Sequence, residues 1–186
     1  MDSIIKLLIE FEGIIGAILG SVATLITTEL LKSRGKIRLY LRDFIGVYQT
    51  YRDVGAGRSG KTDDDFYGYK MKYSFEVYNG TDLSRIMRGF RVVFYNGDKA
   101  VFSETPKNEE TRRYSQHFSS IDEMEILNIY PREIQVLKHS LYISEEDLDK
   151  IEDSTKIVMT YYNEKDKQKS LILSDEKVTK KDYKPK

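Results

Sequence analysis

The hydrophobic pattern divides the chain into an apolar N-terminal stretch and a longer part in which apolar and polar positions alternate. Residues 13–28 carry no charge and lie between Glu12 and Glu29. As a helix they would cover roughly 24 Å, less than the roughly 30 Å hydrocarbon core of a bilayer. Apolar residues continue on both sides, so we expect one transmembrane helix from about Ile4 to Leu31.

A signal peptide and a buried helix are the alternatives for this stretch. The tripeptide Ser21-Val22-Ala23 resembles a cleavage site, but a signal peptide begins with a basic region. Here three acidic residues precede the apolar stretch and only one lysine does. This start favours a membrane anchor.

A basic cluster follows the apolar stretch, made of Lys32, Arg34, Lys36, Arg38 and Arg42. Positive charge is retained on the cytoplasmic side of a membrane. We therefore expect a single-pass protein of the cell membrane, with its N-terminus outside and its larger part in the cytoplasm. The first four of these residues are also expected to contact anionic lipid headgroups, although a topology signal alone explains the cluster.

Small residues recur along one face of the predicted membrane helix. Gly16, Gly20 and Thr24 are each four residues apart. Such a face lets two helix backbones approach closely in lipid. The pattern predicts self-association through the helix; the alternative is that glycine is simply common in membrane helices.

From Lys36 onward the hydrophobic period is two, which is typical of β-strands. Turn signals such as Asn79-Gly80 and Asn96-Gly97-Asp98 separate the alternating segments. The predicted strands are 37–42, 69–78, 90–95, 100–102, 124–130, 134–143, 156–162 and 170–173, with 44–51 as a further plausible strand.

One short helix interrupts the strands. Ser144 is expected to cap it, acidic residues follow, and Leu148 and Ile151 would share its buried side. About seven to nine short strands predict an Ig-like β-sandwich, with a small barrel as the alternative. The domains are therefore 1–35 (membrane helix and basic segment), 36–175 (β-sandwich) and 176–186 (flexible basic tail). The arrangement is similar to that of small membrane-anchored bacterial proteins.

Composition removes several classes of function. The chain has 30 basic and 30 acidic residues and no cysteine. A disulfide framework and thiolate chemistry are excluded, and zero net charge disfavours nucleic-acid binding. His117 and His139 lack the spacing of metal ligands, so each is interpreted as an ordinary surface or half-buried residue. No metal, cofactor or catalytic residue is expected.

The segment GAGRSGKT at residues 55–62 matches a phosphate-binding P-loop through Gly55, Gly60, Lys61 and Thr62. A working P-loop needs a helix that begins at the Lys-Thr pair. Here three aspartates follow instead, and an alternating strand begins soon after. We therefore interpret residues 53–65 as a glycine-rich loop between strands. Loose calcium binding by the aspartates is a further alternative, but the rest of the EF-hand pattern is absent.

Arginines are the remaining candidates for binding an anionic partner. They are Arg85, Arg88 and Arg91 near one strand, and Arg112 and Arg113 in the polar stretch 105–120. This stretch is expected to be a long loop that leads into a strand near Phe118. The simpler interpretation is a solvated face balanced by neighbouring acids such as Glu109.

The leading hypothesis is a non-enzymatic, membrane-anchored module that binds an unknown protein partner. It would form an oligomer through Gly16 and Gly20. A sensor–effector is the second hypothesis: the β domain would bind a ligand or foreign protein, and clustered membrane helices would respond. Nucleotide hydrolysis at residues 55–62 is the third.

Overall fold

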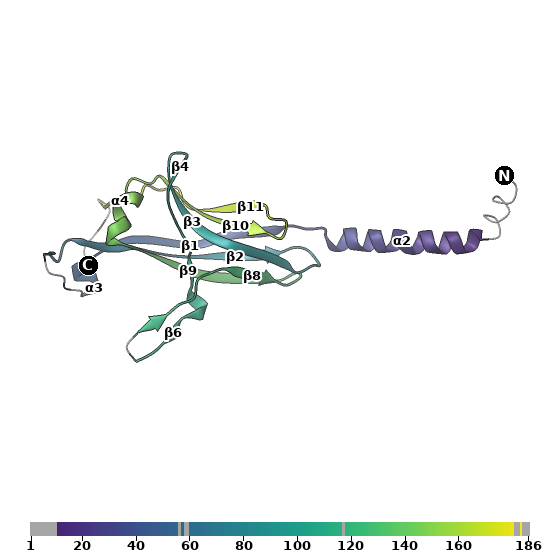
Figure 1. Ribbon diagram of the computed structural model, residues 1–186, viewed down its shortest axis with the longest axis horizontal. Coiled ribbons are helices and arrows are strands. Elements are labelled where there is room, and N and C mark those ends of the chain that lie inside the picture. Colours follow the sequence, from purple (N-terminus) through teal and green to yellow (C-terminus); the bar gives the residue numbers. More distant parts are fainter. Residues whose placement is uncertain (1–10, 56, 58–59, 117, 181–182, 184–186) are drawn as a thin grey trace.

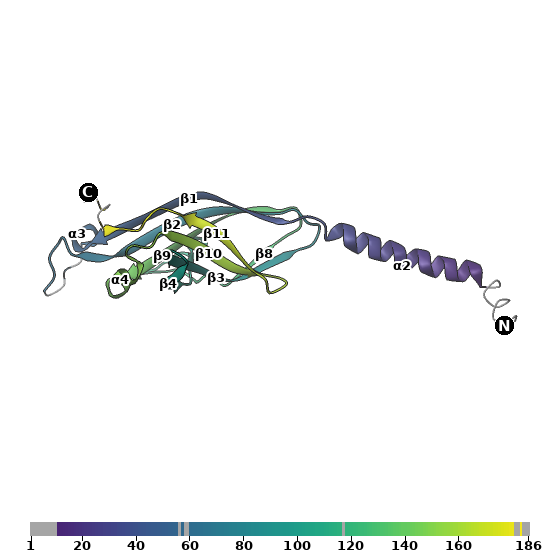
Figure 2. The same cartoon turned by 90° about the horizontal axis from the view of Figure 1, so that it is seen from above.

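The computed structural model describes residues 11–55, 57, 60–116, 118–180 and 183. A long helix, α2 (Glu12–Lys32), projects from one end of an elongated β domain (Figure 1). The view from above shows the same end-to-end arrangement (Figure 2). The predicted helix start at Ile4 and the residue His117 lie outside the described residues.

One sheet of the domain, sheet A, has four antiparallel strands in the order β1-β2-β9-β5. Strand β2 pairs along its length with β1 on one side and with β9 on the other. The predicted alternation is therefore real but extends further than expected. The strands are β1 (Ile37–Thr50), β2 (Phe66–Asn79), β9 (Ile134–Ser144) and β5 (Lys107–Asn108).

The second sheet, sheet B, has the order β11-β10-β3-β4, and β8 pairs with the first residues of β3. Within the described residues the two sheets do not join into a closed ring. The predicted sandwich is therefore confirmed, and the barrel alternative is wrong. The strands are β3 (Arg85–Asn96), β4 (Lys99–Glu104), β8 (Ile126–Ile129), β10 (Lys156–Asn163) and β11 (Gln168–Ser174).

Two segments predicted separately, 37–42 and 44–51, form the single strand β1, except that Tyr51 already belongs to the short helix that follows. The register with β2 shifts by one residue between Leu41 and Asp43. Such a bulge exchanges the faces of a strand, because successive side chains point to opposite sides. Leu39 and Leu41 face inward before the bulge, and Gly46 and Tyr48 do so after it.

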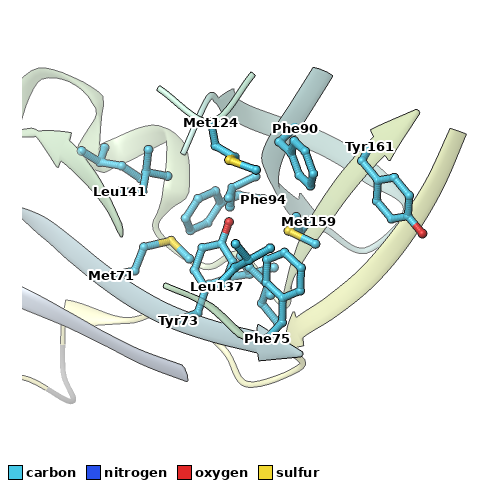
Figure 3. Packing of buried hydrophobic residues seen from close by; sticks show 14 of the residues in the cluster. Met71, Tyr73, Phe75, Phe90, Phe94, Met124, Leu137, Leu141, Met159 and Tyr161 are labelled. Atoms are coloured by element: carbon cyan, nitrogen blue, oxygen red, sulfur yellow. The ribbon is translucent and has the colours of Figure 1, made fainter. Parts of the chain in front are cut away.

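The core lies between the two sheets and is rich in aromatic and methionine side chains (Figure 3). Each fully buried large apolar side chain contributes about 1.5–3 kcal/mol relative to its exposed state. The rings of Phe90 and Tyr161 stack at 5.9 Å, which joins β3 to β10. Side chains with at most 1% exposure include Met71, Phe75, Phe90, Phe94 and Met159.

The predicted short helix is present as a 3₁₀ turn, η2 (Glu145–Asp147), followed by α4 (Leu148–Ile151). Leu148 and Ile151 are buried, as expected. Ser144 occupies the N-cap position with extended backbone, but its side chain makes no capping hydrogen bond. The helix therefore begins where it was predicted, but the prediction that the Ser144 side chain caps it is wrong.

A second short helix, α3 (Tyr51–Val54), begins just before the predicted glycine-rich loop. Thr50 and Asp53 form a reciprocal capping box, and Gly55 ends the helix in the left-handed conformation. A capping box satisfies backbone donors at both positions and so stabilises even a single turn. The loop prediction for residues 53–65 is therefore wrong at its start.

The polar stretch 105–120 is not one long loop. It contains β5, a 3₁₀ turn η1 (Glu109–Thr111), and a small hairpin of β6 (Arg113–Tyr114) and β7 (Ser119–Ser120). This hairpin projects from the side of the sandwich (Figure 1). Tyr114 and Phe118 on it are 80% and 69% exposed.

The described part of the C-terminal segment packs onto the domain, where a flexible tail from residue 176 was predicted. Val178 is 6% exposed, and its amide donates to the carbonyl of Ser154 at 2.8 Å. The hydroxyl of Tyr183 donates to the Asp53 carboxylate at 2.8 Å. A few apolar and aromatic residues within a basic segment are enough to fix it, and their short spacing gives no periodic signal.

Candidate functional site

The end of α2 is bound directly to the loop between β2 and β3. The amide of Asp82 donates to the carbonyl of Lys32 at 3.1 Å, and the amide of Gly80 donates to the carbonyl of Lys36 at 3.2 Å. The five-residue segment from Lys32 to Lys36 is thereby held against the β domain at both of its ends. We call this region, formed by residues 32–36, 79–85 and 164, the junction.

Asn79 organises the junction from inside the domain, where it is fully buried. Its amide nitrogen lies 2.8–3.1 Å from the carbonyls of Leu83, Ile129 and Tyr130. Its amide oxygen accepts from the amide and the hydroxyl of Thr81. A single side chain therefore ties the β2–β3 loop to the end of β8.

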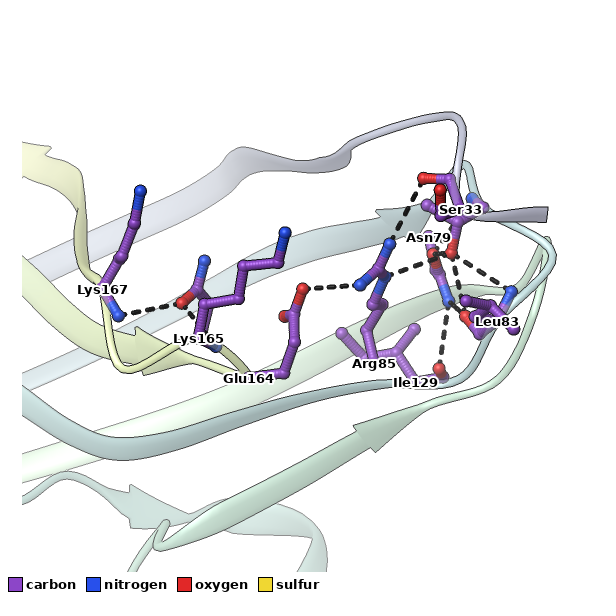
Figure 4. A network of polar contacts seen from close by, with 10 residues as sticks. Ser33, Asn79, Leu83, Arg85, Ile129, Glu164, Lys165 and Lys167 are labelled. Atoms are coloured by element: carbon purple, nitrogen blue, oxygen red, sulfur yellow. Dashed lines mark hydrogen bonds and ion pairs between the residues drawn. The ribbon is translucent and has the colours of Figure 1, made fainter. Parts of the chain in front are cut away.

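Arg85 connects this loop to the helix and to the turn between β10 and β11 (Figure 4). Its guanidinium donates to the Glu164 carboxylate at 2.6 Å and to the carbonyl of Ser33 at 3.4 Å. It also donates to the hydroxyl of Thr81 at 3.3 Å. The side chain of Arg85 is only 15% exposed, so these contacts are largely shielded from water.

Gly35 gives the junction its close backbone approach. Its φ of +117° is a conformation that other residues rarely adopt. A Cβ at this position would lie 2.1 Å from the carbonyl oxygen of Gly80. The chain therefore turns from helix into strand through a position that only glycine fits.

The predicted headgroup residues lie at and beyond the helix end. Lys32 is the last residue of α2 and pairs with Glu29 at 3.3 Å. Arg34 and Lys36 lie in the linker, and Arg38 lies on β1. None of the three forms an ion pair with an acidic residue in the described part of the chain. Their contact with lipid stays a prediction.

Helix α2 itself is long and apolar enough to cross a membrane. Its 21 residues span about 31 Å, and none of them is buried against the domain. A signal sequence passes the same test of length and composition. Gly16 and Gly20 have no other atom near their missing side chains, and the Thr24 hydroxyl bonds the carbonyl of Gly20 at 2.8 Å. The small-residue face is therefore open.

The P-loop-like segment lies at the opposite end of the domain from the helix. No helix begins at Lys61 or Thr62 among the described residues; the chain turns directly into β2. The amide of Thr62 donates to the Asp65 carboxylate at 2.7 Å. The Lys61 ammonium pairs with Glu145, which raises the pKa of Lys61. The donors that a P-loop aims at phosphate are thus directed to carboxylates.

His139 is buried rather than on the surface, so the earlier interpretation of this residue is wrong. It is 1% exposed, and its Nδ1 lies 3.2 Å from the hydroxyl of Tyr73. Burial lowers the pKa of His139 to about 4. The period-two pattern of β9 places it between Leu137 and Leu141 on the inner face. Among the described residues no cluster of three or more His, Asp or Glu side chains can hold a metal.

The arginine candidates are mostly neutralised by carboxylates. Arg112 makes a bidentate contact with Glu109, the acid predicted to balance it. Arg88 pairs with Asp166, and Arg113 with Asp122. Arg91 differs, because its Nε donates to the hydroxyl of Ser103 at 3.0 Å. No free cluster of arginines is formed on β3.

The outward face of sheet A carries exposed apolar side chains that sequence reasoning did not single out. The register aligns Tyr40 with Glu76 and Val136, and aligns Val47 with Lys70 and Tyr142. The sequence could have indicated this face, because the alternation predicts which strand positions point outward, and several of those positions are apolar rather than polar. Six side chains on this face are 43–62% exposed: Tyr40, Ile45, Val47, Ile134, Val136 and Tyr142.

Comparison with known proteins agrees with this architecture. A family model described as the YopI Ig-like domain matches residues 35–174. The SPbeta prophage-derived uncharacterized protein YopI of Bacillus subtilis (strain 168) is 24% identical over 176 residues, which is 94% of this chain and 99% of that protein.

Two solved structures are similar at low identity. A protein from Archaeoglobus fulgidus has 11% identity and a TM-score of 0.39, covering 75% of this chain and 97% of its own. A flagellar-like filament structure has 9% identity and a TM-score of 0.38, covering 95% of this chain and 99% of its own.

Proposed function

This chain belongs to the YopI Ig-like domain family, and from that premise we propose that it is a membrane-anchored protein whose Ig-like domain binds another protein. Fold alone does not specify function, so the proposal depends on a surface. The observation that carries it is the outward face of sheet A, with its six exposed apolar side chains. These side chains form two rows, on β1 and β9, with outward polar residues of β2 between them. Exposed apolar side chains gathered on one face are typical of protein interaction sites.

The chemistry of this face suits a protein partner. Tyrosines and aliphatic residues are interspersed with Lys70 and Lys72, and aromatic side chains are enriched at protein interfaces. The hydroxyl of Tyr142 donates to the carbonyl of Tyr67 at 3.1 Å, so its ring is held in place. A preformed aromatic anchor loses little entropy when a partner binds.

We place the anchor in the cell membrane, with the domain in the cytoplasm. The length of α2 and the basic residues that follow it support this orientation. The open face at Gly16, Gly20 and Thr24 supports self-association within the bilayer. The proposed role is non-enzymatic.

A photocrosslinking amino acid at position 45 of the full chain, expressed in its native cell, tests the proposed surface. We expect a discrete crosslinked protein from position 45, because Ile45 is 62% exposed on the outward face of sheet A. Position 172 is the matched control, since Ile172 is 54% exposed on sheet B.

The substitution Val136→Lys on the same face should remove the crosslink from position 45. A crosslink of equal strength from both positions, or one that survives Val136→Lys, contradicts the assignment of the surface. A product of twice the chain mass identifies a second copy as the occupant and contradicts binding of a different protein.

The junction favours the sensor–effector as a second candidate. Backbone and side-chain bonds hold the helix end to the loop that Asn79 organises. A binding event that shifts this loop would therefore be transmitted to α2 rather than absorbed by a flexible linker. The Arg85 variant described in the Discussion tests this coupling.

A further inference from the structure

We propose that the β10–β11 turn is a second membrane-contact element, in which Lys165 and Lys167 bind anionic lipid headgroups. This inference rests on the proposed membrane anchoring by α2. It adds a contact made by the Ig-like domain itself to the contact expected from the basic linker.

The position of the turn follows from the junction. Glu164 and the carbonyl of Ser33 contact the same guanidinium, that of Arg85. Ser33 is the residue that directly follows α2. The first residue of the turn and the end of the helix are therefore separated only by the side chain of Arg85. Both views show the turn directed toward the helix (Figures 1 and 2), and Figure 4 shows Lys165 and Lys167 on it.

The carboxylates at this end of the domain are mostly engaged by arginines. Glu164 pairs with Arg85, and Asp166 pairs with Arg88. Asp82 pairs with Arg132 at 2.7 Å, which lowers the pKa of Asp82. Lys165 and Lys167, by contrast, make no side-chain ion pair with any described residue. Their ammonium groups remain for an external anion.

The net charge of zero conceals a strong polarity along the domain. The segments nearest the helix (33–38, 80–88, 130–133 and 163–167) carry eight Lys or Arg and four Asp or Glu. The segments at the far end (51–65, 144–155 and 176–180) carry six basic and eleven acidic residues. An anionic surface therefore attracts the near end and repels the far end.

The occupant that fits this polarity is a lipid surface rather than a soluble anion. The helix end delivers the turn to the level of the headgroups, where each Lys or Arg near an anionic leaflet is stabilised. Attraction falls off within a Debye length of about 8 Å. The two lysines would therefore hold the domain end-on over the bilayer, with sheet A exposed at its side.

The absence of cysteine allows a direct test in the full chain. A fluorophore is attached to Gln168→Cys beside the turn, and the protein is placed in lipid nanodiscs that carry a headgroup-linked acceptor. We expect stronger energy transfer in discs containing phosphatidylglycerol than in discs of phosphatidylcholine alone. The transfer reports the ratio of molecules whose turn contacts the bilayer to molecules whose turn is free of it. Replacing both lysines by glutamine should lower this ratio by about fivefold per lysine.

Two controls make the result specific. A fluorophore at Asp98→Cys, in the turn at the far end of β3, should give the same transfer in both kinds of disc. The variant Lys99→Gln/Lys107→Gln removes two exposed lysines elsewhere and should leave the Gln168→Cys signal unchanged.

Co-migration of the chain with the discs separates the two levels of the proposal. A chain that does not enter the discs overturns the membrane anchor and this inference with it. A chain that enters them, but whose signal near the turn is equal in neutral and anionic discs or insensitive to loss of Lys165 and Lys167, overturns this inference alone.

Discussion

Glu164 and Ser33 share one guanidinium. Arg85 donates to the Glu164 carboxylate at 2.6 Å and to the Ser33 carbonyl at 3.4 Å. A turn of sheet B and the residue after the helix are thereby joined across the end of the sandwich. The orientation of the helix relative to the domain is thus determined by side-chain chemistry as well as by the linker.

Replacing Arg85 by glutamine should loosen the helix from the domain. The shorter neutral side chain cannot reach both acceptors, so the helix would sample a wider range of orientations. Electron–electron distance measurements between spin labels at residues 26 and 99 should give a broader distribution. Arg88→Gln is the matched control, because Arg88 lies on β3 like Arg85 and pairs with the exposed Asp166 but not with the helix end. Equal distributions for both variants would show that the linker backbone alone sets the orientation.

Asn79→Ala should destabilise the domain strongly. The substitution leaves three buried carbonyls and the Thr81 donors without their partner. Buried unsatisfied groups of this kind cost on the order of 2–4 kcal/mol together. Urea unfolding measures the loss. The control Asn128→Ala, at an exposed position of β8, should change stability by less than about 0.5 kcal/mol. A loss as small as that of the control would mean that water replaces the Asn79 contacts.

The free energy of unfolding should decrease as the pH is lowered, because His139 is buried in its neutral form. Burial lowers its pKa from 6.5 to about 4, so between these values the unfolded chain binds a proton that the folded chain does not. The contribution is fully present above pH 6.5 and is lost as the pH falls toward 4. Between pH 7 and pH 5 the loss is about 2 kcal/mol.

The variant His139→Phe isolates this effect in urea unfolding at the two pH values. Its stability should fall by about 2 kcal/mol less than that of the wild type, since every other titrating group is shared by the two proteins. Tyr73→Phe is the control that removes the hydrogen-bond partner and keeps the imidazole. Equal pH dependence in His139→Phe and wild type would contradict a buried neutral histidine.

Lys61→Ala should have no effect on nucleotide binding, measured with a fluorescent ATP analogue. The Lys61 ammonium pairs with Glu145, and no helix follows it to bind phosphate. Because the ion pair is partly exposed, its loss should change the stability of the domain only slightly. Affinity for the analogue that is present in wild type and absent in Lys61→Ala would restore the P-loop interpretation.

Replacing Gly16 and Gly20 by isoleucine should reduce self-association in the membrane. The larger side chains would separate two helices that pack through the open small-residue face. Chemical crosslinking in membranes measures the change, and Ile14→Leu/Ile18→Leu on the same helix is the control of similar volume. Unchanged crosslinking in the glycine variant would remove the helix as the contact between copies.

Local patterns in the sequence determined the class of each segment. Uncharged apolar residues between Glu12 and Glu29 predict the helix, because a long apolar run needs apolar surroundings along its whole length. Period-two alternation predicts the strands and the sandwich, because alternate side chains of a strand face one core. The pattern also contained the bulge near Leu41 and the inward position of His139, as a change of phase and as an inner-face position.

Only the tertiary structure decided which distant residues meet. Nothing near Arg85 indicates that it contacts Glu164 and Ser33, and Lys165 and Lys167 look like ordinary turn residues until the turn is placed beside the helix end. The sequence around position 35 does not show that glycine is needed there; the need arises from the carbonyl of Gly80, which lies against it. Such contacts depend on the order of strands in the sheets, and pairing of distant strands leaves no local periodic signal. The charge polarity of the domain arises in the same way, since folding gathers scattered loops at two opposite ends.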